Sequence, residues 1–141
     1  MAANPEWTNR EATEYWIEKV WNQQDENTIT ELMAEDCNLK GLDIPANGRE
    51  GFQAFHRAIT TSFDDVKVEI LEIGVDGDLV FGHCQFTGNH RASGKDVVTH
   101  FSMSGKWKDG LLVEGRNVVD FTQMLTQVGE LAPDAMARVF A

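Results

Sequence analysis

The stretch from Val97 to Phe121, VVTHFSMSGKWKDGLLVEGRNVVDF, decides the fold. Its centre, Lys108-Asp109-Gly110, has the composition of a tight turn, and runs rich in β-forming residues lie on both sides of it. This pattern predicts a long antiparallel hairpin. If Trp107 faces Leu111 across the turn, the pairing fixes which side chains share a face of the sheet.

That register divides the hairpin into two faces of different composition. The odd-numbered face is almost wholly apolar and carries Val97, Phe101, Met103, Trp107, Leu111, Val113, Val119 and Phe121. The even-numbered face is mixed and carries Val98, His100, Ser102, Ser104, Leu112, Glu114, Arg116, Val118 and Asp120. A few polar groups among apolar ones are typical of a ligand pocket, so we expect the mixed face to enclose a cavity. Because a monomer rarely leaves a large apolar patch in water, we expect the apolar face to form a homodimer.

The residues before the hairpin predict two more strands. Val66, Val68 and Ile70 alternate with polar residues, and Asp76-Gly77 is a strong two-residue hairpin signal before a strand from about Leu79 to Thr87. The expected result is a meander of four long antiparallel strands.

Helices are expected at both ends of the chain. Thr8-x-x-Glu11 and Thr28-x-x-Glu31 are capping boxes, and each predicts a helix after it. Phe52, Phe55, His56 and Ile59 have the spacing of one face of a third helix. A short helix from Met124 ends at Gly129, and a last turn carries Met136, Val139 and Phe140 after Pro133. Helices followed by a meander predict an α+β fold with the helices packed on one face of a bent sheet.

Length and charge restrict the function. A chain of 141 residues predicts one domain, residues 1–141, with a core that needs no metal or disulfide. The net charge of −11 disfavours nucleic acid and anionic membranes as partners, because their phosphates repel it. No segment has the length and apolarity of a membrane span or a secretion signal, which predicts a cytoplasmic protein. Cys37 and Cys84 are in no CxxC spacing, so we expect buried reduced thiols.

Short segments along nearly the whole chain resemble the nuclear transport factor two-like superfamily, and within it the SnoaL-like polyketide cyclase group. They are Val20-Trp21-Asn22-Gln23-Gln24-Asp25, Leu32-Met33-Ala34-Glu35-Asp36, Gly48-Arg49-Glu50-Gly51-Phe52, Thr87-Gly88-Asn89-His90, Asp109-Gly110 with Glu114 and Asp120, and Gln127-Val128-Gly129. The resemblance implies a cone-shaped α+β barrel, as in the cystatin-like folds, with a pocket, no obligatory cofactor and usually a homodimer. In those cyclases an aspartate of the final strand is the acid/base of an intramolecular aldol ring closure, and its matching position here is Asp120.

Three polar residues of the mixed face are the candidate site. Desolvation of Asp120 on a pocket wall would raise the pKa of its carboxyl group and suit it to moving a proton from carbon; alternatively, Asp120 caps the helix that begins near Phe121. Arg116 could hold a substrate carboxylate or enolate oxygen, or form an ion pair with Glu114 or Asp120. His100 could couple to Asp120 as a second catalytic residue, or be a satisfied buried histidine.

Other residues are weaker candidates for contacts with a substrate. His56 and His83 could reach the pocket, although a single histidine on an apolar face is more often part of the core. Tyr15 could donate a hydrogen bond to a carbonyl, and Trp16 could line an aromatic site or the core. No histidine spacing favours a metal, so we expect none. Two functions stay open: a cofactor-free cyclase or isomerase with Asp120 as acid/base, and a non-catalytic binding protein for a small apolar acid or carbonyl compound.

Overall fold

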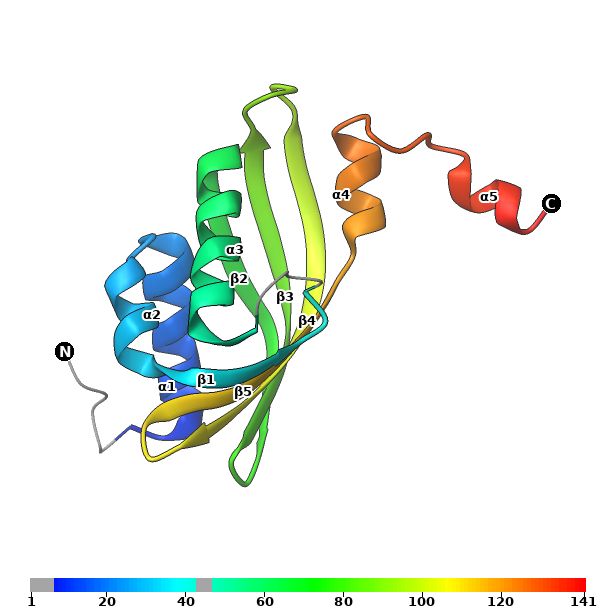
Figure 1. Cartoon of the computed structure of the whole chain (residues 1–141). Helices are drawn as coiled ribbons and strands as arrows, with labels where there is room; N and C mark the ends of the chain where they lie inside the picture. Colours follow the sequence, from blue (N-terminus) through cyan, green and yellow to red (C-terminus); the bar gives the residue numbers. More distant parts are fainter. Residues whose placement is uncertain (1–6, 43–46) are drawn as a thin grey trace.

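A computed structural model describes residues 7–42 and 47–141, and its sheet curves around a layer of helices (Figure 1). Within this part of the chain the strand order is β1-β5-β4-β3-β2, with β1 parallel to β5 and the other pairs antiparallel. The strands are β1 (Met33–Lys40), β2 (Phe63–Asp76), β3 (Leu79–His90), β4 (Asp96–Lys108) and β5 (Leu111–Val119). The predicted α+β class and four-strand meander are confirmed, and β1 adds a fifth strand. The sheet is strongly curved, but it does not close into a barrel.

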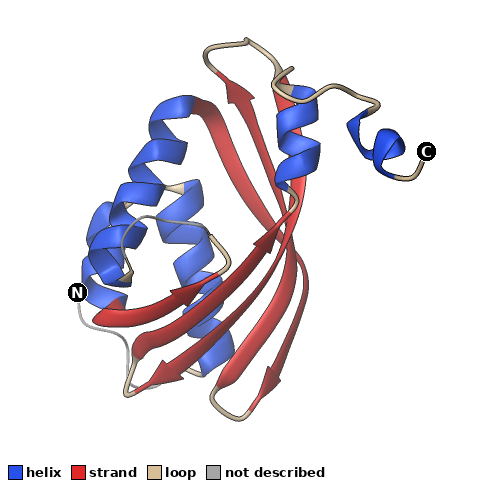
Figure 2. Cartoon of the chain, turned by 45° about the vertical axis from the view of Figure 1, so that its right-hand side comes forward, coloured by secondary structure: helices blue, strands red, loops and turns tan. Residues whose placement is uncertain are grey.

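The N-terminal helices and α3 cover the concave side of the sheet (Figure 2). The helices are α1 (Asn9–Trp16), the π-helix η1 (Ile17–Asn22), α2 (Glu26–Leu32), α3 (Gly48–Ser62), α4 (Phe121–Gln127) and α5 (Ala135–Val139). The predicted capping box at Thr8 is confirmed. The predicted cap at Thr28 is wrong: Asp25 accepts the N–H of Asn27, and the buried Thr28 hydroxyl donates to the Asp25 carboxylate instead.

The hairpin of β4 and β5 pairs two residues away from the expected register. Trp107 lies opposite Leu112 and not opposite Leu111, which is a shift of one residue, and a bulge between Lys106 and Trp107 adds a second. Ser104 therefore lies opposite Arg116, not opposite Glu114. Beyond the bulge Trp107 pairs with Leu112, and both side chains are buried. The bulge thus moves Leu112 to the odd-numbered face, while Arg116 and the residues after it keep the parity that the sequence predicts.

Glycines allow the sheet to bend over the helices. A Cβ atom at Gly82 would lie 2.7 Å from the carbonyl oxygen of Glu72, and one at Gly105 would lie 2.9 Å from the Leu112 side chain. A larger residue at Gly82 would force the backbone to shift, whereas one at Gly105 would have to displace the end of the Leu112 side chain. Glycines inside strands commonly mark such bends, so we attribute part of the curvature to them.

Two side-chain amides complete the hydrogen bonding of strands where no neighbouring strand is available. Asn22 of η1 donates to the carbonyl of Val68 and accepts its N–H, at 3.1 and 2.7 Å. Gln127 of α4 does the same for Val98, at 2.7 and 2.8 Å. Each amide fixes a helix to the sheet. At the buried Val68 an unpaired backbone group would cost about as much as a lost hydrogen bond, whereas Val98 is exposed.

None of the helices that the structure describes is long and apolar enough to span a bilayer. Cys37 and Cys84 are both free and fully buried, as predicted. Burial raises the pKa of each thiol to about 11.

We expect both thiols to be inert in the native protein. At pH 8 a thiol with a pKa of about 11 is roughly one-thousandth thiolate, and the thiolate is the reactive species. Iodoacetamide should therefore label native protein at least roughly a hundredfold more slowly than protein unfolded in urea, as counted by mass spectrometry. Equal rates in the two states would contradict the buried positions.

Replacing Gln127 should loosen α4 from the sheet. Gln127→Met removes both hydrogen bonds to the Val98 backbone and should lower the free energy of unfolding by roughly 1–3 kcal/mol in urea titrations. Gln123→Met is the matched control on the same helix, because the Gln123 side-chain oxygen has no hydrogen-bond partner among the described residues. A loss of stability as large in the control as in Gln127→Met would show that the paired amide has no special role.

Candidate functional site

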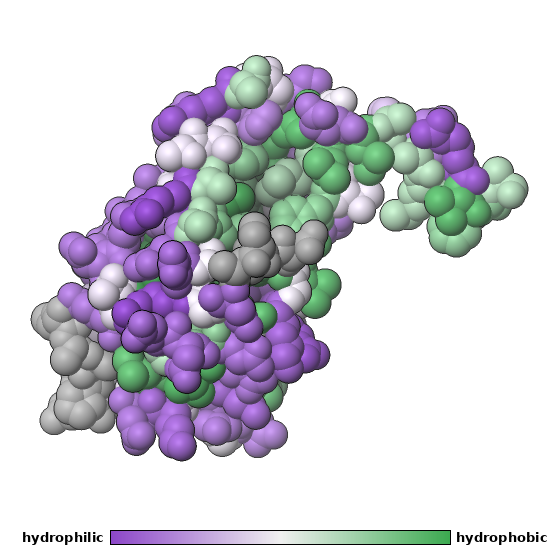
Figure 3. Space-filling view, in the orientation of Figure 1, coloured by the Kyte–Doolittle hydropathy of each residue, from purple (hydrophilic) through white to green (hydrophobic). Residues whose placement is uncertain are grey.

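A cavity of about 100 Å³ lies between the helical layer and the concave face of the sheet. One water molecule needs about 10–15 Å³ on this scale, so the space can hold a small organic molecule. Its aromatic wall includes Trp16, Trp21, Phe52, Phe55, Phe101 and Trp107. Figure 3 shows apolar surface gathered between α3 and α4, where the face is hollowed. Phe121 and Met124 bring α4 to the cavity as part of its wall.

The odd-numbered face of the hairpin, not the even-numbered one, lines this cavity. Phe101 and Met103 of β4 and Asn117 and Val119 of β5 are all lining residues. The prediction that the mixed face encloses the pocket is therefore wrong, and so is the argument that the apolar face is free for a partner. Burying a large apolar side chain stabilises a fold by about 1.5–3 kcal/mol, whereas burying unpaired charges destabilises it, so the apolar face turns inward.

Asp120 and Arg116 consequently lie outside the cavity. The exposed Asp120 carboxylate accepts the N–H of Gln123 at 2.9 Å and caps α4, which is the alternative that the sequence left open. Arg116 is exposed and forms no ion pair with the part of the chain that the structure describes. Its expected partner Glu114 contacts Lys40 and Lys106 instead, at 3.6 and 3.4 Å.

The two histidines of the outer face meet each other. The rings of His83 and His100 stack with centroids 5.7 Å apart and an interplanar angle of 5°. His83 Nδ1 also lies 3.3 Å from the Ser102 hydroxyl. Both histidines are on the opposite side of the sheet from the cavity, so the predicted cavity positions of His83 and His100 are wrong.

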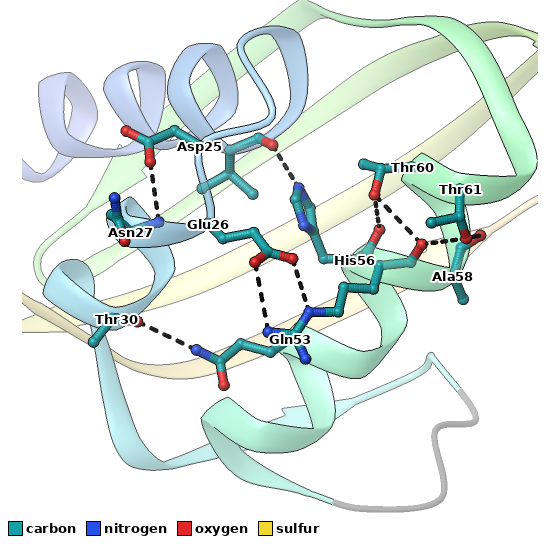
Figure 4. Close-up of polar contacts among 11 residues, drawn as sticks. Asp25, Glu26, Asn27, Thr30, Gln53, His56, Ala58, Thr60 and Thr61 are labelled. Atoms are coloured by element: carbon teal, nitrogen blue, oxygen red, sulfur yellow. Dashed lines mark hydrogen bonds and ion pairs between the residues drawn. The ribbon is translucent and has the colours of Figure 1, made fainter.

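His56 has a structural position in the helical layer. It is fully buried and is not a lining residue of the cavity. Its Nε2 donates to the Val20 carbonyl at 2.6 Å, near the end of η1, where carbonyl groups lack helical partners (Figure 4). The Trp21 ring packs 5.0 Å from the imidazole. His56 thus holds the π-helix that presents Trp21 to the cavity.

Of the two N-terminal aromatic candidates, only one reaches the cavity. Trp16 is buried and lines it, as the sequence suggested. Tyr15 packs its ring 4.5 Å from that of Trp7, with the Lys19 ammonium 5.7 Å away, and is not a lining residue.

Most polar groups of the cavity wall are already hydrogen bonded. The Thr99 hydroxyl donates to the Asp120 carbonyl at 2.7 Å. The Thr13 hydroxyl accepts from the Trp107 indole at 2.9 Å and donates to the Asn9 carbonyl. These bonds fix α1 and the end of β5 to β4, and they leave little polar capacity for a ligand.

Asn117 is a polar lining residue that was not recognised from the sequence. It pairs with Met103 across the strands, and its side-chain amide makes no hydrogen bond to any described residue. Gly41, with φ +89°, brings the end of β1 against the Asn117 carbonyl; a Cβ atom at Gly41 could not be accommodated there. Its position as a lone amide among the apolar residues of the odd-numbered face was the signal in the sequence that could have identified it.

Across residues 7–42 and 47–141 the cavity has no charged or histidine side chain in its wall. The same residues contain no group of three or more His, Cys, Asp or Glu that could hold a metal ion. Asp43 and Pro45, whose residue types are typical of turns, lie outside the described part. The described wall can therefore enclose and orient a small molecule and donate hydrogen bonds to it.

Solved structures with this architecture come from several bacteria. IdmH of Streptomyces antibioticus, a candidate polyketide cyclase, is 24% identical with a TM-score of 0.78 over 87% of this chain and 99% of its own. TsrD of Streptomyces laurentii is 19% identical with a TM-score of 0.77 over 86% and 95%. A protein of Catenulispora acidiphila with a ketosteroid isomerase-like fold, solved with trimethylamine, is 18% identical with a TM-score of 0.74 over 89% and 100%.

No curated protein sequence matches the chain significantly. The model of the SnoaL-like polyketide cyclase family matches residues 12–128, which include every strand and the helices from η1 to α4. The chain therefore belongs to the SnoaL-like polyketide cyclase family.

Proposed function

We propose that this protein binds a small, largely apolar carbonyl compound inside the cavity. The observation that carries the proposal is a preformed hollow of about 100 Å³ whose wall is almost entirely apolar and contains one amide, Asn117, with no hydrogen bond to the described residues. Ligand sites usually combine such a wall with a few polar groups that fix orientation. The aromatic wall favours a flat, ring-containing molecule.

Asn117 would orient the ligand by its carbonyl oxygen. The side-chain N–H of the half-buried Asn117 donates, and the ligand carbonyl accepts, within a wall that is otherwise almost entirely apolar. An amide without a hydrogen-bond partner in an apolar wall costs more free energy than one in contact with water. The cavity should therefore bind ketones, which supply that partner, more tightly than hydrocarbons.

Family membership supports ring closure as a second candidate function. A cavity that folds a flexible polycarbonyl chain brings its reacting carbons together. The described wall holds no base, so the acidic proton between two carbonyl groups would leave to solvent water or hydroxide, and the aldol oxygen would take a proton back from water after the carbon–carbon bond forms. The Asn117 amide would donate to the enolate oxygen. The expected acid/base role of Asp120 would require the reacting carbon to reach the outer face, so we assign the polar contact to Asn117. With a linear polycarbonyl thioester, Asn117→Leu should lower ring closure roughly a hundredfold, as followed by mass spectrometry of the products.

The amide can be tested with a matched pair of probes. Asn117→Leu should weaken binding of 2-acetylnaphthalene roughly 3- to 10-fold in titrations of tryptophan fluorescence, because one neutral hydrogen bond is lost. Binding of 2-ethylnaphthalene, which lacks the carbonyl, should not weaken. Ser102→Ala, on the outer face, is the control variant. The proposal fails if neither probe binds wild type, or if Asn117→Leu leaves ketone affinity unchanged.

Substitutions of Asp120 should affect stability and not ligand affinity. Asparagine caps helices about as well as aspartate, so Asp120→Asn should keep the wild-type Tm and the wild-type Kd for 2-acetylnaphthalene. Asp120→Ala removes the cap of α4 and should cost about 1 kcal/mol of unfolding free energy, again with the ketone affinity nearly kept. A markedly weaker Kd for Asp120→Asn would return this carboxylate to the ligand site.

A further inference from the structure

Two tryptophans of the helical layer bring polar groups to the cavity wall. Trp16 ends α1 and is 7% exposed, Trp21 lies in η1 and is 9% exposed, and both line the cavity. The ring of Phe52 lies against both indoles, with centroids 5.5 Å from Trp16 and 6.1 Å from Trp21. The N–H is the only polar group of an indole, and it can donate a hydrogen bond but not accept one. Each tryptophan therefore adds one possible donor to the wall.

Neither of these indole N–H groups has a hydrogen-bond partner in the described part of the chain. Among the same residues, the side-chain nitrogen and oxygen atoms that are both unpartnered and shut off from open space are His56 Nδ1 and Gln123 Oε1. The nitrogens of Trp16 and Trp21 therefore lack a partner but reach open space. Both side chains are more than nine-tenths buried and line the cavity, which makes the cavity the open space next to them.

The π-helix explains why both tryptophans face the same space. Residues five apart in an α-helix lie about 140° apart around its axis, so a regular continuation of α1 would turn Trp21 away from Trp16. The turns of η1 are wider, as the i→i+5 bond from the Gln23 N–H to the Glu18 carbonyl at 2.9 Å shows. Such turns bring residues five apart close to one side of the helix, and they are frequent at functional sites.

The free donors of the cavity belong to two different walls. The Asn117 amide comes from β5 of the sheet, whereas the two indoles come from the helical layer. A carbonyl oxygen that lies against the sheet leaves the donors of the helical layer without an acceptor. A molecule with two carbonyl oxygens can satisfy both walls at once.

We propose that the indole N–H groups of Trp16 and Trp21 bind a second carbonyl oxygen of the ligand, apart from the one that Asn117 holds. This inference rests on the proposed function, because it concerns the same cavity. It adds two specificity-determining residues and narrows the ligand to a flat dicarbonyl compound. Donors in an apolar wall gain more from a partner than donors in water do, so the second oxygen should raise the affinity.

A matched pair of ligands tests the second oxygen. 1,4-Diacetylbenzene has two carbonyl groups, and 4-ethylacetophenone has a methylene group in place of one of them. Wild type should bind the diketone roughly 3- to 10-fold more tightly in isothermal titration calorimetry, as expected for one further neutral hydrogen bond. Trp16→Phe combined with Trp21→Phe keeps both rings but removes both N–H groups, so the difference should vanish. Trp7→Phe is the control, because Trp7 packs on Tyr15 and does not line the cavity.

The same titrations separate this inference from the proposed function. If neither compound binds wild type, the proposed function fails and this inference fails with it. If both bind wild type with equal affinity, or if the double variant keeps the full difference, the cavity still binds ketones but the two tryptophans do not hold a second oxygen.

The indole signals provide a test that needs no substitution. In ¹⁵N-labelled protein, bound 1,4-diacetylbenzene should move the indole proton signals of Trp16 and Trp21 downfield from their positions with 1,4-diethylbenzene, which has no acceptor. Trp107 is the internal control, because its indole already donates to Thr13 at 2.9 Å. Indole N–H groups that point at a neighbouring aromatic ring would keep the same positions with both compounds, and that result would overturn the proposal.

Discussion

Burial of the odd-numbered side chains of β4 and β5 is the interaction on which the rest of the structure depends. Phe101, Met103 and Val119 turn toward the helices and create the cavity wall. Every second residue of a strand points the same way, so this choice also sends Arg116 and Asp120 to the other side of the sheet. The position of the cavity and the character of the outer surface are therefore two results of one hydrophobic constraint.

Several segments that resemble the cyclase group hold the backbone in place. Asn22 and Gln127 are in two of these segments. The Asn22 amide pairs with the edge strand β2, and the Gln127 amide pairs with β4 at Val98, where β5 has ended. Gly48, with φ +83°, passes so close to the Glu35 carbonyl that a Cβ atom would lie 2.8 Å from it. The guanidinium of Arg49 donates to the carbonyls of Thr30 and Met33, which joins α3 to the start of β1. These residues explain why the resemblance predicts the fold well and says less about the chemistry.

The helices, strands and turns were predictable because each depends on residues close together in the sequence. The orientation of the hairpin depends on distant parts of the chain. The capping box at Thr8 and the hairpin turn near Gly77 depend on a few neighbouring residues. The capping box is present as expected, and the turn predicted at Asp76-Gly77 is present one residue later, at Gly77-Asp78. Which face of the hairpin turns inward depends on which side chains the helices bury against the sheet. A cluster of Arg116, His100 and Asp120 looks like a site, but polar clusters of this kind also suit a solvated face. Asn117 escaped notice because one amide in an apolar row gives a weak signal.

The inward orientation can be tested most directly with methionine methyl groups. Met33, Met103 and Met124 line the cavity, whereas Met136 is on the exposed helix α5. In protein labelled with ¹³C at the methionine methyls, bound 2-acetylnaphthalene should give nuclear Overhauser effects to the three cavity methyls and none to Met136. Effects confined to Met136, or a bound probe close to none of the cavity methyls, would contradict the account of which face encloses the ligand.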